Sequence, residues 1–259
     1  MRTGNDSNFK HFASQYLERK FGCMSHRCPD CWHERVRCIC HEIVSPIAFR
    51  DNLNFIVYMD YKEVYNAGDD AKIMQCYCSR QSKRFIYPIE DDLLIDFVRK
   101  LAQPSTVIVL FPSKDAITVK NFLDIKPGSE YLGKRVYDEQ NVLNIIVIDG
   151  VWRHARRMAQ RLRELFPNVT FVKLSPEQLS VYARTQTQPD RISSIEALAL
   201  FLNQIGEDPN SCNRLISCVE MNNRALRGKI TARKQQKIYY SKLDRHPAWY
   251  FDNRYCGHL

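Results

Sequence analysis

Short, almost uninterrupted runs of apolar residues recur along the chain and predict buried strands. They cover residues 54–59, 106–111 and 144–148, which are rich in β-branched and aromatic side chains, and residues 169–174 follow the same pattern. Strands without a polar face are typical of a parallel sheet that is covered on both sides. The pattern therefore predicts a largely parallel sheet with helices on both faces.

Segments with helical periodicity alternate with these strands. Apolar residues recur every three or four positions in residues 90–101, and again from Trp152 until Pro167 stops the helix. Capping residues and apolar spacing predict further helices at residues 8–21, 193–205 and 209–227. The alternation of strands and helices places the chain in the α/β class.

The composition agrees with a folded protein that acts on polyanions. Of 259 residues, 44% are hydrophobic and 26% are charged, which excludes a disordered or collagen-like chain. Lysine and arginine outnumber acidic residues by 38 to 29, so the formal charge is +9 and nucleic acid is the favoured partner. No apolar run reaches the roughly 18 residues of a membrane span, and residues 1–20 lack the apolar core of a secretory signal. We therefore expect no membrane association and a cytoplasmic or nuclear location.

The cysteines concentrate near the N-terminus, where five of the ten fall between residues 23 and 40. In a chain that is expected to stay in a reducing compartment, this favours metal ligation over disulfides. The spacing C-x2-C-x6-C-x-C offers four thiolates to one zinc ion, from Cys28, Cys31, Cys38 and Cys40. Four thiolates leave no open position for water, so the predicted zinc is structural.

The exact ligand set of this predicted zinc site stays open in the sequence. Four further residues with suitable donor atoms lie close enough to replace one of the thiolates: Cys23, His26, His33 and His41. Catalysis is expected elsewhere in the chain, because a closed structural site offers no place for a substrate.

Two loops at the carboxyl ends of the apolar strands are the candidates for chemistry, because open α/β sheets bind ligands in that crevice. They consist of Phe111, Pro112 and Ser113, and of Asp149, Gly150, Val151 and Trp152. The sequence contains neither G-x-G-x-x-G nor a P-loop, so it supports neither a dinucleotide site nor a nucleoside triphosphatase.

Several of these stretches occur together in one known family. The stretches are 110–116 (LFPSKDA), 147–158 (VIDGVWRHARRM), the cysteine cluster, and a run over 180–197 that contains Tyr182, Arg184, Ser193, Ser194, Ile195 and Glu196. In order and spacing, over residues 28–202, they resemble the DTW-domain family of tRNA-uridine aminocarboxypropyltransferases. The combination is far more specific than any one of the motifs.

The sequence departs from the family pattern at two places. The family motif is D-x-T-W, whereas Val151 stands where threonine is expected. Asp69 and Asp70 stand where the similar segment, residues 61–72 here, usually ends in Asn-Thr before its helix. This pair adds negative charge near the expected ligand loop, so either the loop still caps a helix or the substrate preference has changed.

The resemblance implies a fold, a reaction and a layout. The fold is similar to that of SPOUT methyltransferases, with a knotted core that forms the S-adenosylmethionine site. The reaction transfers the 3-amino-3-carboxypropyl group from S-adenosylmethionine to N3 of a uridine in tRNA and releases methylthioadenosine. The expected layout is an N-terminal extension (1–22), a zinc-binding cluster (23–50), a catalytic core (51–206), and a C-terminal helix with a basic tail (207–259).

Catalytic roles follow from position and charge. Asp149 is the candidate base for the N3 proton of uridine, although an aspartate just before a helix often serves only as its cap. Trp152 would support the loop, although it also fits a core aromatic. The two loops, together with Ser193, Ser194 and Glu196, would hold the co-substrate, while a capped helix start explains those last three residues equally well.

Arginines that flank the candidate site are expected to bind RNA phosphates. They occupy the faces left by the apolar stripe of the helix after Trp152, together with one residue further along: Arg153, Arg156, Arg157, Arg161 and Arg163, and Arg184. A planar guanidinium matches a phosphate in a bidentate manner. An ordinary solvated helix face is the alternative. Arg184 and Arg191 could instead meet the carboxylate of the transferred group.

Two other functions remain compatible with the sequence. One is an RNA methyltransferase of similar fold that uses the methyl group of S-adenosylmethionine. The other is a non-catalytic, zinc-containing RNA-binding protein, for which Val151, Asp69 and Asp70 are the motive. A ribosomal RNA target, the oligomeric state, and the choice between nucleus and cytoplasm are left open.

Overall fold

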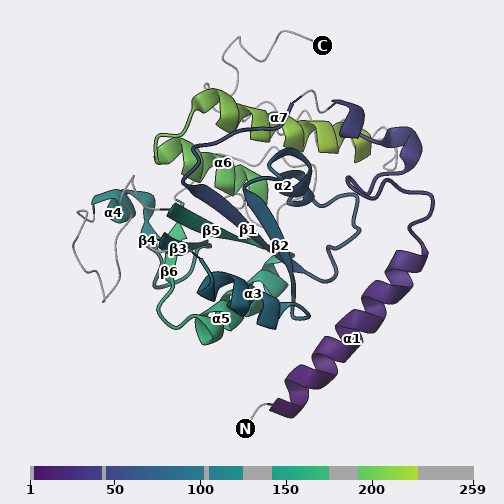
Figure 1. The fold of residues 1–259 in the computed structure, drawn as a ribbon, viewed down its shortest axis with the longest axis horizontal. Helices are drawn as coiled ribbons and strands as arrows, with labels where there is room; N and C mark the ends of the chain where they lie inside the picture. The colour runs from purple at the N-terminus through teal and green to yellow at the C-terminus, as the bar shows by residue number, and fades with distance from the viewer. Residues whose placement is uncertain (1–2, 43–44, 102–104, 125–141, 175–191, 227–259) are drawn as a thin grey trace.

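The computed structural model describes residues 3–42, 45–101, 105–124, 142–174 and 192–226 (Figure 1). Six strands form one sheet in the order β2-β1-β5-β3-β6-β4, and every neighbouring pair is parallel. The strands are β1 (Leu53–Asp60), β2 (Ser82–Tyr87), β3 (Ser105–Leu110), β4 (Ile117–Thr118), β5 (Val142–Asp149) and β6 (Thr170–Lys173). The predicted parallel α/β fold is confirmed.

Helices cover both faces of this sheet, as Figure 1 shows, with α2, α6 and α7 on one face and α3 and α5 on the other. The helices are α1 (Thr3–Gly22), α2 (Lys72–Tyr77), α3 (Asp91–Arg99), α4 (Val119–Asp124), α5 (Trp152–Leu165), α6 (Ser194–Gln204) and α7 (Pro209–Leu226). Two short 3₁₀ helices, Arg35–Arg37 and Cys40–Glu42, lie in the cysteine-rich segment.

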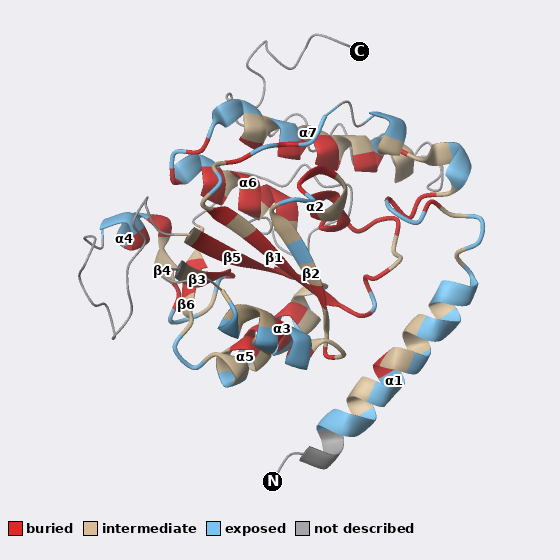
Figure 2. Ribbon diagram, viewed as in Figure 1, coloured by how far each residue is buried: buried red, intermediate tan, exposed pale blue. Residues whose placement is uncertain are grey.

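The two faces of the sheet belong to two separate apolar cores, and alternate residues of β1 belong to each. Figure 2 shows that β1 and β5 are buried over almost their whole length. Phe55 and Val57 pack with Phe201 of α6 and Leu215 of α7. On the opposite face, Tyr58 and its neighbours pack with α3 and α5. This double burial explains why the strand sequences are almost wholly apolar.

The N-terminal helix α1 packs against the start of the loop after β1 through aromatic side chains. The ring centroid of Tyr61 lies 5.9 Å from that of Phe9 and 5.3 Å from that of Tyr16, in edge-to-face arrangements. Lys10 Nζ forms a 2.8 Å ion pair with Asp92 of α3. The helix begins earlier than the predicted residue 8, since it includes Thr3.

Two expectations fall partly outside the described residues. Residues 175–191, between β6 and α6, are not described, so the predicted knot stays a prediction. Most of the predicted basic tail, residues 227–259, also lies outside the described ranges. Within those ranges, none of the helices has the length and apolarity needed to cross a bilayer.

Candidate functional site

The four cysteines of the predicted zinc site converge in space. The Sγ atoms of Cys28 and Cys40 are 3.7 Å apart, as are those of Cys31 and Cys38. A tetrahedron with Zn–S bonds of about 2.3 Å has sulfur–sulfur edges of about 3.8 Å. The cluster is therefore compatible with a structural zinc ion held by four thiolates.

None of the alternative ligands joins this cluster. His33 is buried, and its Nε2 lies 2.8 Å from Oδ1 of Asn222 in α7. Cys23, His26 and His41 are exposed, and the described donor group that could hold an ion contains none of them. Of the candidate donors that the sequence left open, the structure brings together the four cysteines.

The segment that carries the four cysteines, residues 28–40, is tied to the rest of the fold through α7. The buried Asn222 that meets His33 also donates from Nδ2 to the carbonyl oxygen of Asp69, at 3.1 Å. Beside it, Met221 and Ala225 pack on the cysteine cluster. The buried amide of Asn222 therefore links the cysteine-bearing segment to the loop before α2.

That loop forms part of a buried acidic cluster at the carboxyl end of the sheet. The carboxylates of Asp69, Asp70 and Asp149 approach one another within 4.8 Å, and all three residues are buried. Asp149 is the last residue of β5, whereas the other two come from the segment between β1 and α2. The second departure from the family motif therefore lies beside the candidate base.

Asp149 is not the cap of the following helix. The N-cap of α5 is Val151, which makes no side-chain cap bond. Oδ1 of Asp149 accepts a 3.1 Å hydrogen bond from the hydroxyl of Ser194, and its Oδ2 has no partner among the described residues. Buried polar atoms in native proteins almost always have partners, so this oxygen is available to a ligand.

The electrostatic environment favours the protonated carboxyl groups. Burial, followed by the nearby charges of Asp69, Asp70 and Glu63, raises the pKa of Asp149 well above its ordinary value. Burial and the charges of Asp70 and Glu63 raise the pKa of Asp69 to about 7. Lys72 offsets this repulsion in part, although its own burial lowers its pKa to about 8. The cluster therefore has a deficit of positive charge.

This deficit predicts a pH-dependent stability. The pKa of Asp69 is higher in the folded than in the unfolded chain. Its contribution to the free energy of unfolding is therefore fully present below about pH 4 and is lost as pH rises through about 7. We expect the unfolding free energy of the wild type to fall between pH 5 and 7 by about 2 kcal/mol more than that of Asp69→Asn. Urea unfolding at each pH measures this difference.

The exposed Asp96→Asn change in α3 serves as the control for this measurement. It removes an equal charge from a solvated position, where the cost of burial does not arise. Parallel curves for the wild type and Asp69→Asn would contradict the assignment.

Gly150 allows the loop after β5 to approach β1. A Cβ atom at this position would lie 3.1 Å from Cβ of Asp60 and 3.5 Å from Sδ of Met158. Oδ2 of Asp60, the last residue of β1, lies 2.7 Å from Nδ1 of His154 in α5. A glycine here therefore lets the hydrogen bond between Asp60 and His154 brace the loop that carries Asp149.

Val151, where the family motif has threonine, is half exposed and caps α5 without a side-chain acceptor. A threonine hydroxyl at an N-cap accepts a bond from a free backbone N–H group and stabilises a helix by about 1 kcal/mol. We expect Val151→Thr to raise the melting temperature by about 2–4 °C, as measured by calorimetry. Val151→Ala is the control that adds no acceptor, and an equal gain in both variants would contradict the capping explanation.

The second predicted loop contacts the first. The ring centroids of Phe111 and Trp152 are 5.7 Å apart, so Trp152 supports both loops. Ser113 donates to Oδ1 of Asp115 at 2.9 Å and accepts a bond from Arg163, while Pro112 is exposed.

The serine-rich start of α6 serves mainly as a helix cap. Ser193 and Glu196 form a reciprocal capping box, in which each side chain accepts a bond from the backbone N–H of the other. Ser194 differs, because its hydroxyl lies 3.1 Å from Asp149 Oδ1 and 3.2 Å from the carbonyl oxygen of Ile148. Ser194 therefore contacts the acidic cluster directly.

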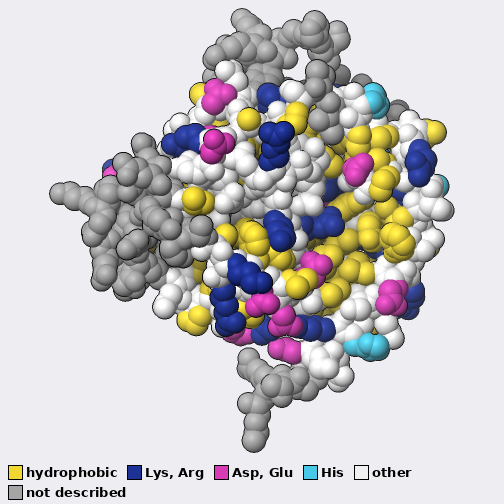
Figure 3. Space-filling view, in the orientation of Figure 1, with side chains coloured by type: hydrophobic (Ala, Val, Ile, Leu, Met, Phe, Trp, Pro, Cys, Tyr) yellow, Lys and Arg dark blue, Asp and Glu magenta, His cyan; other side chains and the backbone are white. Residues whose placement is uncertain are grey.

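The predicted RNA-binding arginines divide into two groups. Arg153, Arg156 and Arg157 are exposed. Arg161 instead holds the buried carboxylate of Asp91 at 2.7 Å and also faces Asp6 and Glu164. Figure 3 accordingly shows basic and acidic side chains interspersed over the lower part of this face. Arg184 and Arg191 lie outside the described residues.

Sequence reasoning missed three charged residues around the site. Asp60, Glu63 and Lys72 are all buried beside it. Asp60 carried a readable signal, because it ends β1 as Asp149 ends β5. Lys72 carried no such signal, because lysines are rarely fully buried and nothing in the neighbouring sequence indicates that this one is.

The comparisons with known proteins give one match. A family model described as the DTW domain matches residues 25–226. No curated protein and no solved structure gives a significant match to the chain.

Proposed function

Because the chain belongs to the DTW domain family, the family of tRNA-uridine aminocarboxypropyltransferases, we propose that it transfers the 3-amino-3-carboxypropyl group of S-adenosylmethionine to N3 of a uridine in tRNA. The observation that carries this proposal is the buried cluster of Asp69, Asp70 and Asp149, with two carboxylate oxygens that lack partners among the described residues. S-adenosylmethionine brings two positive charges, a sulfonium and an ammonium. The ligand would thus supply the charge that the cluster lacks.

The proposed step is a single displacement at carbon. N3 of uridine forms a bond to the methylene carbon beside the sulfonium, the bond between that carbon and sulfur breaks, and methylthioadenosine leaves with the electron pair. The proton of N3 passes to Asp149. Orientation of the two reactants contributes most, because a sulfonium is already a good leaving group.

The acidic cluster makes this proton transfer favourable at the moment of reaction. While the sulfonium is bound, its positive charge stabilises the ionised Asp149. When the bond to sulfur breaks, that charge disappears and the repulsion from Asp69 and Asp70 raises the proton affinity of Asp149. The carboxylate therefore becomes a better base as the reaction proceeds.

The remaining predicted residues have supporting roles in the proposal. Ser194 orients Asp149, and Trp152 packs the two loops together. Phe111, Gly150 and Val151 complete the walls of the co-substrate site. The exposed arginines of α5 and, by expectation, Arg184 would contact RNA phosphates beside it.

Isotopic labelling of the co-substrate tests the reaction. The full chain is incubated with tRNA and S-adenosylmethionine labelled either in the carboxyl carbon or in the methyl carbon, and digested nucleosides are analysed by mass spectrometry. Transfer of the carboxyl label to uridine is the expected result. Transfer of the methyl label would identify an RNA methyltransferase, and RNA binding without either label would identify a non-catalytic RNA-binding protein.

A further inference from the structure

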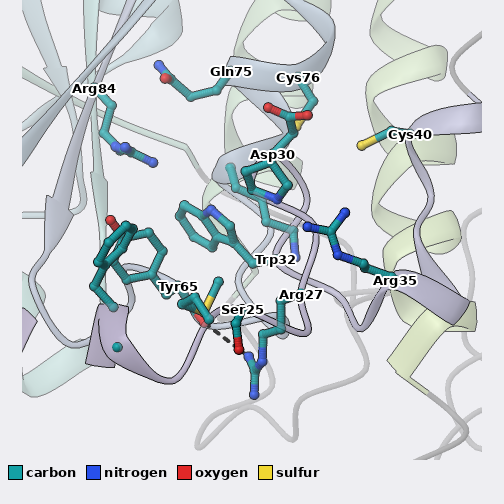
Figure 4. A pocket seen from close by; sticks show the side chains of 15 residues that line it. Ser25, Arg27, Asp30, Trp32, Arg35, Cys40, Tyr65, Gln75, Cys76 and Arg84 are labelled. Atoms are coloured by element: carbon teal, nitrogen blue, oxygen red, sulfur yellow. Dashed lines mark hydrogen bonds between the residues drawn. The ribbon is translucent and has the colours of Figure 1, made fainter. Parts of the chain in front are cut away.

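A cavity of about 900 Å³ lies beside the zinc segment and has no part in the proposed reaction (Figure 4). It is lined by residues from the end of α1, the cysteine-rich loops, α2 and the edge strand β2. Ligand pockets in proteins commonly measure about 300–1,000 Å³, so this cavity is large enough for a nucleotide. The described residues that line it include none of the three aspartates of the acidic cluster.

Aromatic residues form part of its apolar lining, among them the partly exposed Tyr65 and the buried Trp32. The ring centroids of Trp32 and Tyr65 lie 5.8 Å apart, with the rings inclined at 71°. Both residues have left-handed backbone conformations, with φ of 60° and 61°, which bulky residues rarely adopt. Such strained positions cluster at ligand sites, where the rest of the structure holds them in place.

Basic side chains surround these rings. The guanidinium carbon of Arg84 lies 5.4 Å from the centroid of Trp32, and Figure 4 shows Arg35 on the opposite side of that ring. Arg27 and Lys72 also line the cavity, against one acidic residue, Asp30, among the lining residues that are described. Within the described ranges, no carboxylate forms an ion pair with Arg35 or Arg84.

Flat aromatic surfaces beside unpaired guanidinium groups are the combination that binds single-stranded nucleic acid, because bases stack on the rings and phosphates pair with arginine. We propose that this cavity binds an unpaired nucleotide of the RNA substrate, with its base against the partly exposed ring of Tyr65 and its two flanking phosphates paired with Arg35 and Arg84. The choice of RNA rests on the proposed function. The bound nucleotide is a neighbour of the reacting uridine rather than the uridine itself, since the acidic cluster lies outside the cavity.

The cavity and the acidic cluster meet at the first turn of α2. Lys72 lines the cavity, and it follows Asp69 and Asp70 of the cluster by two to three positions. A nucleotide held here would therefore fix the RNA strand close to the loops that carry the chemistry. The cavity thus has a positioning role.

Binding of labelled RNA to the full chain tests this proposal. The probe is a fluorescent single-stranded oligouridylate, measured by anisotropy over a range of salt concentrations. The double variant Arg35→Gln, Arg84→Gln should bind it about tenfold more weakly than the wild type, with a salt slope lower by about 1.4, the value expected for two lost phosphate contacts on a single strand. Its affinity for S-adenosylmethionine should be unchanged.

The matched control is Arg80→Gln, Arg99→Gln, which removes the same charge from two exposed positions outside the cavity. Cross-linking of 4-thiouridine RNA gives a second measurement, and the peptide containing Tyr65 should carry the adduct in the wild type. A stacking variant, Tyr65→Leu, should lower affinity while the melting temperature reports its folding.

The outcomes separate this proposal from the proposed function. Equal RNA affinity in the cavity and control variants would overturn the cavity assignment even if aminocarboxypropyl transfer is observed. Competition by uridine monophosphate as strong as that by the oligonucleotide would also overturn it, because the cavity would then serve a free nucleotide. If the wild type binds no RNA at all, both proposals fail.

Discussion

Asp149→Asn is expected to slow aminocarboxypropyl transfer by about 10²–10⁴-fold, the range associated with losing a general base. The amide retains the size of the side chain and an acceptor for the hydroxyl of Ser194, but it cannot take the N3 proton. The rate at saturating S-adenosylmethionine and tRNA, measured by incorporation of the carboxyl label, gives the effect.

The pH dependence of this rate identifies the group. Asp149 must be ionised to accept a proton, so the wild-type rate should rise with pH through the pKa of Asp149, which burial and its acidic neighbours hold above the usual range for aspartate. The variant should lose this limb of the profile.

A matched control removes a carboxylate from an exposed position instead of from the buried cluster. Asp96→Asn in α3 alters an exposed residue and should leave the rate unchanged. Asp149→Asn should also be at least as stable as the wild type at neutral pH, because it removes a charge from a crowded buried cluster. A folded Asp149→Asn protein with the wild-type rate would show that another group accepts the proton.

Loss of the zinc ligands is expected to have the second large effect. Structural zinc sites of this kind bind with an apparent free energy on the order of 10 kcal/mol, which contributes directly to folding. Cys31→Ser removes a fully buried ligand, so we expect zinc content to fall well below one ion per chain and the melting temperature to drop by more than 5 °C. Atomic absorption and calorimetry measure both quantities.

Transfer activity should fall together with the metal. Without zinc, the segment that holds His33 loses its anchor, and Asn222 loses one of the two contacts that place it under the carbonyl of Asp69. Cys23→Ser is the control, since Cys23 is exposed and lies outside the cluster. Retention of zinc and of the melting temperature by Cys31→Ser would contradict the assigned ligand set.

Much of the fold could be predicted because burial on both faces leaves a strong apolar signal. The strands β1, β3, β5 and β6 were predicted within a few residues for this reason. β2 was missed because this edge strand carries Lys83 and Arg84 and only Phe85 is buried. β4 has only two residues, which is too short for any periodicity.

The candidate site was predicted only in part, because several of its contacts join residues that are far apart in the sequence. Asp149 and its loop lie within one motif, and so do the four cysteines. The acidic cluster instead joins residues almost 80 positions apart, and the contact of His33 with Asn222 spans 189 positions. No local pattern encodes such contacts, because they depend on how β1, β5 and α7 pack.

The two edges of the sheet limit how copies of this chain could join. One edge strand, β2, carries the charged residues Lys83 and Arg84, and the strand at the other edge, β4, has only two residues. Charge and brevity both discourage the addition of a foreign strand. Within the described part of the chain, a continuous sheet across two copies is therefore disfavoured at both edges, and the sheet is protected from edge-to-edge aggregation.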